Sequence, residues 1–457
     1  MSTNIQKNQI TEGIIWRQLL LFFPILLGTF FQQLYNTIDS VIVGQFVGKE
    51  ALAAVGGSSA QIVAFVVGFF TGLSSGASVT IAQFFGAKDS RSANKGLHTA
   101  YAIAAFGGLI LTVSGIILTP FLLEMMNTPA DIVADSAVYL RIYFAGIIFV
   151  LIYNMGSAIL RATGDSKRPL YYLIVCCIIN IVLDVLFVIV FHMGVMGVAV
   201  ATLIAQAVSA VLVTLKLMRS EGILKLSVKQ IRFHGSILKM QLKLGLPTGF
   251  EAILFSITNI AIQSAVNTFG TDTTAAWSAY GKLDAIFWMV STAFGIAITT
   301  FVGQNYGAGK MDRVRKSTRV CLLMDFIVSA VLVVFLIAAR FLLFRLFTND
   351  SHVIEIGCDM LVLITPWYIV YVFIEVIAGA LRGVGNVVVP VAITLLGVCV
   401  LRIAWLAAML KISPTISAII LSYPVTWVIT ALAFIIYYIY ITHKTIAGSS
   451  KKHVPKL

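Results

Sequence analysis

Apolar runs of 18 or more residues recur along the whole chain, and they constrain the fold more than any other feature. Each run is long enough to cross a bilayer as an α-helix. We count twelve, centred roughly on residues 30, 65, 108, 147, 180, 206, 254, 289, 331, 368, 399 and 428. Transmembrane β-strands would be shorter and alternate in polarity, a pattern that this sequence lacks. The sequence therefore predicts an all-α polytopic membrane protein with twelve transmembrane helices.

Composition and motifs agree with a chain that lies mostly in lipid. Of its 457 residues, 59% are hydrophobic and 11% are charged, against about 25% charged residues in a typical soluble domain. The first apolar run is too long for a signal peptide, so we expect a retained first span. The five cysteines have no C-x-x-C spacing, and no G-x-x-x-x-G-K-[ST] motif occurs. We therefore expect no disulfides, no metal ligation by cysteine and no ATP-driven pumping, and nothing in the sequence supports an enzyme.

The net charge of +13 follows the expected membrane topology. If both termini are cytoplasmic, the inward loops contain most of the basic residues, among them Lys88, Lys167 and Arg313. The outward loops contain acids such as Glu50 and Asp131, with few lysines. This asymmetry is the positive-inside rule. It predicts a multi-pass membrane protein with cytoplasmic termini, and it explains the basic charge without a nucleic-acid partner.

Two sequence motifs recur at one offset. "QFFGAK", Gln83 to Lys88, returns as "QNYGAG" at Gln304 to Gly309, a shift of 221 residues. "AILRATGDSKRP", from Ala158, returns as "GALRGVGNVVVP", from Gly379, with the same shift. Two matches at one offset indicate an internal duplication. Each half has six spans, so the repeats have the same orientation in the membrane.

The duplication predicts two pseudo-symmetric six-helix lobes. We expect an N-lobe at residues 1–217, a basic cytoplasmic connector at 218–240, a C-lobe at 241–443 and a cytoplasmic tail at 444–457. Two parallel lobes suit alternating access, in which one lobe rocks against the other. The alternative is that duplication produced only a larger bundle, as in a channel or a scaffold.

Polar residues inside the apolar runs are the candidate functional residues. Asp39 lies in the first run, Asn180 and Asp184 share one face of the fifth, and Thr202 lies in the sixth. A carboxylate at the bilayer centre costs roughly 2.5–3.5 kcal/mol on insertion scales, and such residues usually face a cavity. Together these four could bind Na⁺ through their oxygens, or two acids could share a proton.

Simpler interpretations of each residue remain open. Asp39 could reach water near the outer interface. Asn180 could bond to a neighbouring helix, and Thr202 could bond to its own backbone. The four residues together are a stronger signal than any one of them.

The second half has its own ionisable residues within spans, and their charges are of both signs. They are Glu251, Lys282, Asp284, Glu375 and Arg402. Internal ion pairing and a substrate or cation site are both open interpretations.

Smaller expectations concern packing and span ends. Gly68, Gly72 and Gly76 lie on one helical face, a spacing typical of close helix contacts. We expect Asp325 to pair with Arg319, and His98 to be interfacial.

The chain resembles the multidrug and toxic compound extrusion family over nearly its whole length. The resemblance rests on "LYNTIDSVIVGQFVGKEALAAVG", "QFFGAK", "LRATGD" and their counterparts in the second half. It implies twelve helices in two lobes around a central cavity. It also implies export of cationic, amphiphilic compounds in exchange for inward H⁺ or Na⁺, without another cofactor, by a protein that we expect to be a monomer in a bacterial plasma membrane.

The resemblance also implies residue roles. It places Asp39, Asn180, Asp184 and Thr202 in the N-lobe cation site of the bacterial members. Pro24 matches the proline at which the first helix bends in some proposed mechanisms. Positions expected to line the substrate cavity are Gln32, Tyr35, Asn36 and Asn154.

The C-lobe departs from the family pattern. Glu251 matches an acid of members with a C-lobe cation site, but Tyr371 replaces their aspartate in the tenth helix and Glu375 lies one turn later. The complete N-lobe set resembles the DNA-damage-inducible branch more than the Na⁺-coupled norfloxacin branch. The alternative function is a flippase for lipid-linked sugars, which would favour a strongly cationic cavity.

Overall fold

The structure is a computed structural model that describes residues 10–448, and every regular element in that range is helical. The expected tail extends beyond this range, since residues 449–457 lie outside it. Twelve helical segments are long and apolar enough to cross a membrane, and each expected centre falls within one of them. The predicted fold class is therefore confirmed.

The chain divides into two compact units. Among the described residues, unit 1 comprises Ile10 and Phe23–Phe250, and unit 2 comprises Thr11–Phe22 and Glu251–Gly448. The chain thus passes between units three times, once in the turn at Ile10–Thr11 and twice inside helices, in α3 and in α10. The lobe boundaries that we expected at residues 218–240 stay a prediction.

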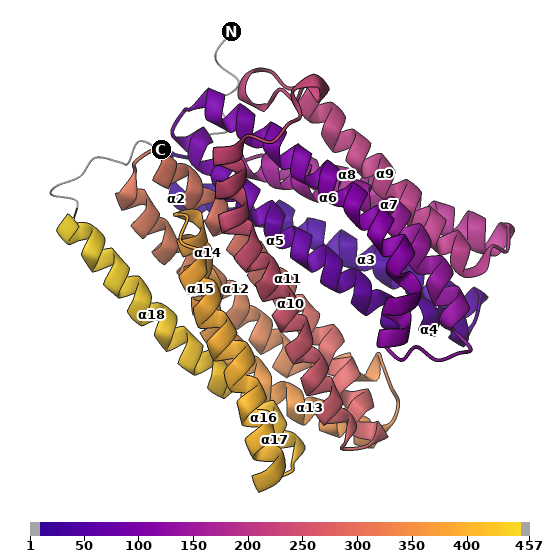
Figure 1. Ribbon diagram of the computed structural model, residues 1–457. Coiled ribbons are helices and arrows are strands. Elements are labelled where there is room, and N and C mark those ends of the chain that lie inside the picture. Colours follow the sequence, from indigo (N-terminus) through magenta and orange to yellow (C-terminus); the bar gives the residue numbers. More distant parts are fainter. Residues whose placement is uncertain (1–9, 449–457) are drawn as a thin grey trace. The chain divides into compact units, whose positions relative to one another are not determined.

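Unit 1 consists of the first six spans and the start of the seventh (Figure 1). Its elements are α3 (Phe22–Phe46), α4 (Lys49–Gly56), α5 (Ser58–Gly86), α6 (Ser90–Met125), α7 (Val133–Ala162), α8 (Lys167–Asp184), the π-helical η1 (Val185–Val190), α9 (Gly194–Met218), the short η2 (Gly222–Leu224) and η3 (Val228–Gln230), and the first part of α10 (Gly235–Asn267).

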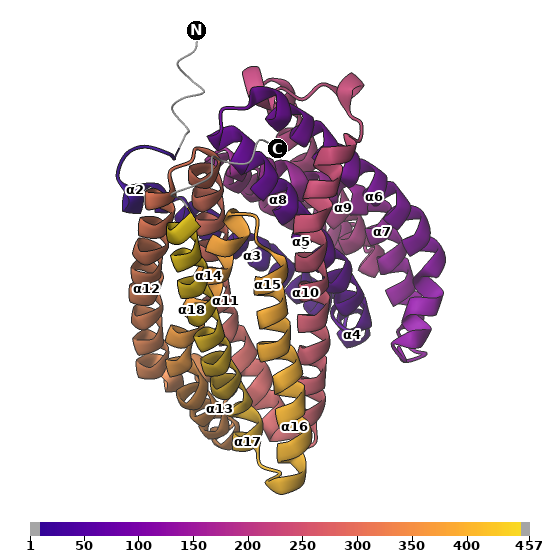
Figure 2. The same cartoon turned by 60° about the vertical axis from the view of Figure 1, so that its left-hand side comes forward.

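Helix α7 is central to unit 1, because it packs against α5, α6 and α9. Figures 1 and 2 both show α6, α7 and α9 side by side. Helix α5 approaches the start of α10 very closely. A Cβ atom built on Gly72 would lie 2.3 Å from the Gly249 nitrogen, and one on Gly76 would lie 2.4 Å from the Gln241 oxygen. For these two glycines, the predicted close helix contact is confirmed.

The connector after α9 folds back onto α6. The Asn94 amide donates hydrogen bonds to the carbonyls of Ile223 and Lys225, each at 3.1 Å. The Ser227 N–H donates to Nε2 of His98 at 3.0 Å, while Nδ1 of His98 lies 2.8 Å from the Asn94 carbonyl. His98 is buried beneath the connector, and its expected position at the membrane interface stays a prediction.

Unit 2 consists of the N-terminal helix α2 and the remaining spans. Its elements are α2 (Ile15–Leu19), the rest of α10, α11 (Thr271–Gly307), α12 (Met311–Arg345), α13 (Ser351–Ile364), η4 (Thr365–Trp367), α14 (Tyr368–Gly383), α15 (Val388–Thr394), the π-helical η5 (Leu395–Val400), α16 (Leu401–Ile412), α17 (Ile416–Ile420) and α18 (Ser422–Gly448).

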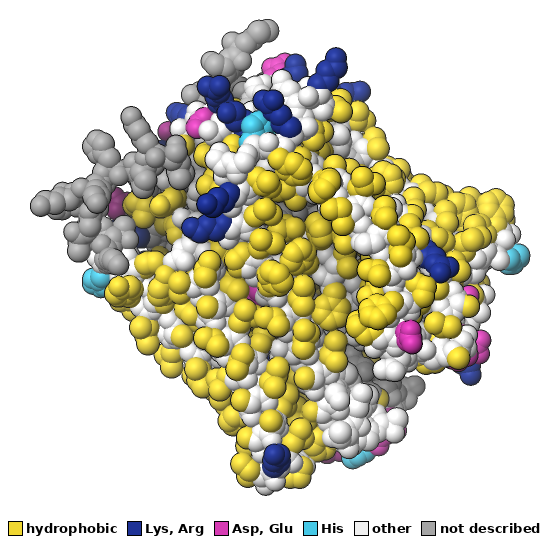
Figure 3. All heavy atoms as spheres, in the orientation of Figure 1, with side chains coloured by type: hydrophobic (Ala, Val, Ile, Leu, Met, Phe, Trp, Pro, Cys, Tyr) yellow, Lys and Arg dark blue, Asp and Glu magenta, His cyan; other side chains and the backbone are white. Residues whose placement is uncertain are grey.

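Helix α11 occupies the centre of unit 2, packed against α12, α13 and α14, and α18 packs on α14. The outward sides of η5 and α16 are apolar: Leu396, Val400 and Ile412 are all exposed. Hydrophobic side chains likewise predominate over α15 and α16 in Figure 3. Such a surface is suited to contact with lipid tails.

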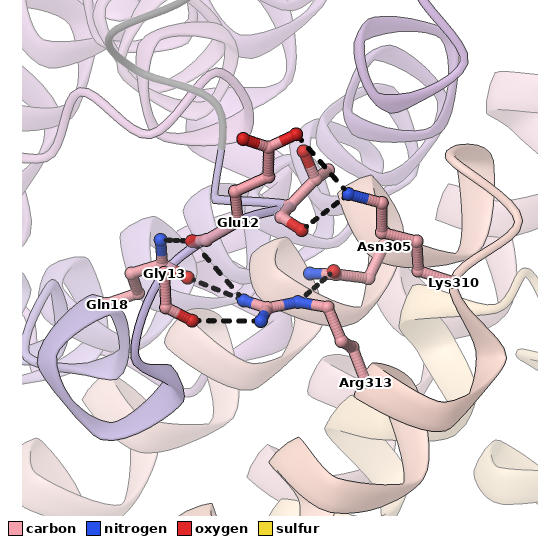
Figure 4. A network of polar contacts seen from close by, with 7 residues as sticks. Glu12, Gly13, Gln18, Asn305, Lys310 and Arg313 are labelled. Carbon is pink, nitrogen blue, oxygen red and sulfur yellow. Dashed lines mark hydrogen bonds and ion pairs between the residues drawn. The ribbon is translucent and has the colours of Figure 1, made fainter.

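The N-terminal segment Thr11–Phe22, which includes the start of the first membrane span, is anchored to α11 and α12 by Arg313 (Figure 4). Arg313 donates to the Gly13 carbonyl and to Oε1 of Gln18, both at 2.9 Å, and to the Glu12 carbonyl at 3.4 Å. Its Nε donates to Oδ1 of Asn305 at 2.9 Å. All of these residues belong to unit 2.

Lys310 and an aromatic pair add to this anchor. Lys310 Nζ donates to the Thr11 carbonyl at 2.9 Å and lies 3.7 Å from Oε1 of Glu12. The rings of Phe22 and Phe294 stack at 4.1 Å. The segment Thr11–Phe22 is therefore an integral part of unit 2.

Backbone angles at equivalent turns support the internal repeat. Lys88 has φ 59° and Gly309, which is 221 residues later, has φ 72°. Gly164 and Gly385, related by the same shift, have φ 89° and 88°. Both pairs lie just after helices, where a left-handed residue ends the helix and reverses the chain. Lys88 adopts this conformation despite its Cβ, which costs free energy that glycine avoids.

Candidate cation-binding site

The four polar residues predicted in the first half lie in unit 1, on three helices. Asp39 is on α3, Asn180 and Asp184 are on α8, and Thr202 is on α9. All four are buried, with exposed fractions of 7% for Asp39 and Thr202, 1% for Asn180 and 0% for Asp184. Asp39 therefore does not reach water at the interface in this structure.

These side chains surround the Asp39 carboxylate but leave it incompletely bonded. Thr202 Oγ1 donates to Oδ2 of Asp39 across 3.5 Å, a long hydrogen bond. Asp184 and Asn180 lie within interaction range of Asp39. Within the described range, Oδ1 of Asp39, both carboxylate oxygens of Asp184 and both amide atoms of Asn180 have no hydrogen-bond partner.

Buried oxygens without partners are costly and therefore call for an explanation. Two carboxylates, an amide carbonyl and a hydroxyl are the ligands that a hard cation prefers. A proton held between the two acids would also relieve their mutual repulsion. The arrangement is thus chemically suited to binding Na⁺ or H⁺. No cluster of three or more His, Cys, Asp or Glu side chains suited to a metal ion occurs among residues 10–448.

A local feature of the backbone positions Asp184. The α-helix α8 ends at this residue and continues directly as the π-helical turn η1. Such turns are rare, and they frequently occur at functional sites. The widened turn follows an Ile- and Val-rich stretch, and no sequence signal that we used indicated it.

A second polar pair lies close to the cluster. Gln206 Nε2 donates to the Tyr35 hydroxyl at 3.1 Å, and both residues are buried. Tyr35 was predicted to line the substrate cavity, but the sequence did not indicate Gln206, which lies one turn after Thr202 on α9. Gln32 and Asn154 are half-buried and Asn36 is exposed, all in unit 1. Their role as cavity residues stays a prediction.

Pro24 lies next to an interruption of the first span. Helix α2 ends at Leu19, α3 begins at Phe22, and Pro24 occupies the first turn of α3. Proline is tolerated in the first turn, because the N–H that it lacks would have no partner there. Its role in bending the helix stays a prediction.

In unit 2, the carboxylate of Asp284 has neutral partners. It accepts hydrogen bonds from the Tyr368 hydroxyl at 2.5 Å, the Trp288 indole at 2.7 Å and the Tyr280 hydroxyl at 3.2 Å. An acceptor with three donors is well satisfied. This arrangement favours a structural role for Asp284.

Among the other predicted residues of unit 2, Arg402 lies within electrostatic range of Asp284. Glu375 pairs with Arg382 at 2.8 Å, and Glu251 lies within electrostatic range of that pair. The guanidinium of Arg402 lies over the Tyr423 ring at 4.0 Å and donates to Thr426. Lys282 is exposed. Internal pairing therefore accounts for Glu375, although its partner is Arg382, which the sequence did not single out.

Two further side chains of unit 2 are packed inside it. The Tyr371 ring, at the position where relatives with a C-lobe site carry an aspartate, contacts the Trp288 ring at 4.7 Å and the Trp427 ring at 5.5 Å. Asp325 is fully buried and accepts from Ser329 Oγ at 3.1 Å. Its expected pairing with Arg319 is wrong, because Arg319 is exposed and forms no ion pair with it.

Twelve spans in two related halves, with a buried cluster of oxygens inside one of them, define a membrane transporter rather than an enzyme. The MatE family model matches residues 24–186 and 247–406, which is most of both halves. The chain belongs to the MatE family, the multidrug and toxic compound extrusion transporters.

Curated relatives and solved structures agree with this membership. The chain is 30% identical to the probable multidrug resistance protein YoeA of Bacillus subtilis over 393 residues, 84% of each chain. It is 27% identical over 420 residues to the probable multidrug resistance protein NorM of Thermotoga maritima, covering 89% of this chain and 88% of NorM.

The likeness to solved structures concerns the fold. A structure of MATE in the bent conformation has a TM-score of 0.90 at 20% identity and covers 99% of this chain and 100% of that one. A transporter of the MOP superfamily from Pyrococcus furiosus has a TM-score of 0.89 at 20% identity, covering 97% of this chain and 99% of that one. The narrower placement in the DNA-damage-inducible branch stays a prediction.

Proposed function

We propose that this chain is a secondary active antiporter that exports cationic, amphiphilic compounds from the cytoplasm in exchange for H⁺ or Na⁺. The observation that carries the proposal is the buried set of unpartnered oxygens on Asp39, Asn180 and Asp184. A mobile cation satisfies these oxygens when it binds and leaves them available when it departs. The names of the relatives, which are multidrug resistance proteins, support export of drugs.

The transport cycle that we propose depends on competition between the coupling cation and the cationic drug for the negative charge of the two acids. With the transporter open outward, a cation binds at Asp39 and Asp184, and its charge removes an attraction for a cationic drug. The drug is released, and α3 repacks near Pro24. With the transporter open inward, the site loses its cation and regains affinity for the drug.

The membrane potential supplies the energy for this exchange. A potential of 100 mV is worth about 2.3 kcal/mol per elementary charge moved, or roughly fifty-fold accumulation. Aromatic and methionine side chains would accommodate varied apolar drugs, because they adapt to many shapes. We propose a monomer in the bacterial plasma membrane as the working form.

We assign coupling to unit 1 alone. Asp284 accepts three hydrogen bonds, and Glu375 is paired with Arg382, so neither requires a mobile cation. The flippase that we considered as the alternative is not favoured, since the relatives are multidrug resistance proteins.

The test is efflux of a fluorescent cationic dye from proteoliposomes, driven by a Na⁺ gradient or by a pH gradient. We expect one gradient to drive efflux in the unaltered protein, and Asp39→Asn and Asp184→Asn to abolish it. Asp131→Asn, which changes an exposed acid of the same unit, is the matched control and should transport normally. Normal coupled export by both buried-site variants would contradict the proposal.

Thr202→Val distinguishes the two ions. Removing one oxygen ligand should lower Na⁺-driven efflux by about tenfold, corresponding to roughly 1.4 kcal/mol of cation binding. Proton-driven efflux needs the carboxylates but not a full ligand shell, so it should change little. Loss of dye transport under both gradients would instead indicate damage to the fold.

A further inference from the structure

A cavity of about 890 Å³ lies in unit 2, where α12 ends and α13 begins. Arginines and acids both line it. Arg340 and Arg345 come from α12, and Glu355 and Asp359 come from α13. Its volume is within the range of cavities that hold small organic ligands.

The opposite charges in this cavity do not neutralise one another. The ion pairs within the described range join Arg168 to Asp165, Lys310 to Glu12 and Arg382 to Glu375, and none crosses the cavity. Arg340 donates from one nitrogen to the carbonyl of Ile337 at 2.8 Å. The remaining N–H groups of the two arginines, and both carboxylates, are therefore available to a ligand that carries both charges.

The arginines are also exceptions to the charge pattern of the chain. The topology expected from the sequence puts this end of α12 at the outer face, where basic residues are otherwise scarce. Two arginines at that position therefore need a reason other than orientation. An anionic group held between their guanidinium groups supplies one, because arginine binds phosphate through paired hydrogen bonds.

Apolar surface continues from the charged residues along the helices. Leu342 of α12 and Leu346, directly after it, have exposed fractions of 67% and 72%, and Phe341, which lines the cavity, is 52% exposed. Val362 of α13, also in the lining, is 42% exposed. The cavity therefore has a charged part and an apolar flank, as a phospholipid has.

We propose that this cavity binds the headgroup of a zwitterionic phospholipid with a primary amine, namely phosphatidylethanolamine. Its phosphate lies against Arg340 and Arg345, its ammonium donates to Glu355 and Asp359, and its acyl chains follow the exposed face of α12. Phosphatidylglycerol supplies the phosphate but no ammonium for the two acids. The trimethylammonium of phosphatidylcholine has no N–H to donate, so it binds less well.

The experiment measures lipid retention by the purified full-length protein with native mass spectrometry. The probes are phosphatidylethanolamine and phosphatidylglycerol with identical acyl chains. We expect the unaltered protein to retain phosphatidylethanolamine preferentially. Arg340→Gln with Arg345→Gln should weaken that binding by about tenfold or more, since each lost charge-assisted hydrogen bond is worth on the order of 1.4 kcal/mol.

The acids provide a second, opposite test. Glu355→Gln with Asp359→Asn removes the partners of the ammonium and the repulsion of an anionic lipid. Retention should therefore shift toward phosphatidylglycerol. Arg141→Gln, at an exposed arginine of α7, is the matched control and should leave both lipids unaffected.

Either of two results would overturn the proposal. One is retention of phosphatidylethanolamine by the double arginine variant at the level of Arg141→Gln. The other is an unchanged lipid preference in the double acid variant. If a double variant does not fold, the single changes Arg345→Gln and Glu355→Gln, both at exposed positions, make the same comparison.

Discussion

Replacing Arg313 by glutamine should release the N-terminal segment from α12. In the structure, Arg313 donates three hydrogen bonds to this segment, to Glu12, Gly13 and Gln18. Hydrogen bonds from a charged donor contribute about 1.5–3 kcal/mol each when buried. Because water reaches this half-exposed arginine, we take roughly 1 kcal/mol for each bond, or about 3 kcal/mol in total.

A loss of this size has a measurable effect on local opening. About 3 kcal/mol corresponds to a change of roughly one hundred-fold in the opening equilibrium of the segment. Amide hydrogen exchange reports that equilibrium directly. The amides of Gln18 in α2 and of Leu20, its C-cap, donate to the carbonyls of Ile14 and Trp16 and should therefore be protected from exchange. Their exchange in Arg313→Gln should be about one hundred-fold faster.

Two variants calibrate this measurement. Arg319→Gln removes an exposed arginine of the same helix and should leave exchange in α2 unchanged. Lys310→Gln removes one hydrogen bond and one ion pair, so its effect should be intermediate. If exchange in α2 were the same in Arg313→Gln as in the unaltered protein, the hydrogen bonds would not hold the segment and the reasoning would be refuted.

Three further predictions concern unit 1. Lys88→Gly should raise the free energy of unfolding by about 1 kcal/mol, because glycine has no Cβ atom to be strained at this positive φ. Lys88→Ala keeps the Cβ atom and should not raise it. Equal thermal stability of the two variants would contradict this reasoning. The Asp89 carboxylate caps α6 by accepting from the Ser92 N–H, so Asp89→Ala should lower the free energy of unfolding by about 1 kcal/mol. Asp89→Asn can still accept this hydrogen bond and should retain most of the stability in the same thermal assay. An equal loss of stability in both variants would rule out capping. Burial and the nearby charges of Arg232, Lys95 and His98 lower the pKa of His234, so the neutral ring favours the folded connector. This contribution to the stability of the folded connector is present above the ordinary histidine pKa of about 6.5 and is lost as pH falls through the lower pKa of the folded state. Protection of the connector from proteolysis should therefore decrease over that pH range, and decrease less in His234→Gln. Identical pH profiles of the two proteins would exclude His234 as the cause.

The number and order of the spans could be predicted because lipid leaves few alternatives. A backbone in hydrocarbon must satisfy its own hydrogen bonds, so each long apolar run becomes a helix. The internal duplication could be predicted as well, because "QFFGAK" and "QNYGAG" recur at one offset, and the structure adds that both motifs end in left-handed residues, Lys88 and Gly309. Sequence reasoning succeeded where a local pattern determines the backbone.

The acids of the candidate site could be predicted from the sequence, because charged residues are rare within membrane spans. Asp39 and Asp184 attracted attention because a buried acid is costly, and the structure buries both. Gln206 was missed, because one amide in an apolar helix is an ordinary feature until its partner Tyr35 is known.

Contacts between distant segments left no pattern in the sequence. The anchor of the N-terminal segment consists largely of backbone carbonyls, those of Thr11, Glu12 and Gly13, and every residue type has a carbonyl. In unit 2, the charges of both signs within the spans indicated that internal ion pairs could form, but the sequence did not indicate which residues would pair. Glu375 is bonded to Arg382, while Arg402 lies over the Tyr423 ring.

The passage of the chain between its units inside α3 and α10 has a mechanical consequence. A slack loop would let either unit turn freely, but a continuous helix resists torsion and transmits it along its axis. Pro24 lies in the first turn of α3, and Pro247 lies inside α10, close to the second passage at Phe250–Glu251. Dihedral angles near these prolines are therefore placed to absorb a rotation of one unit. Asp39 is on α3, so the cation that we propose to bind there would act on one of the two helices that link the units.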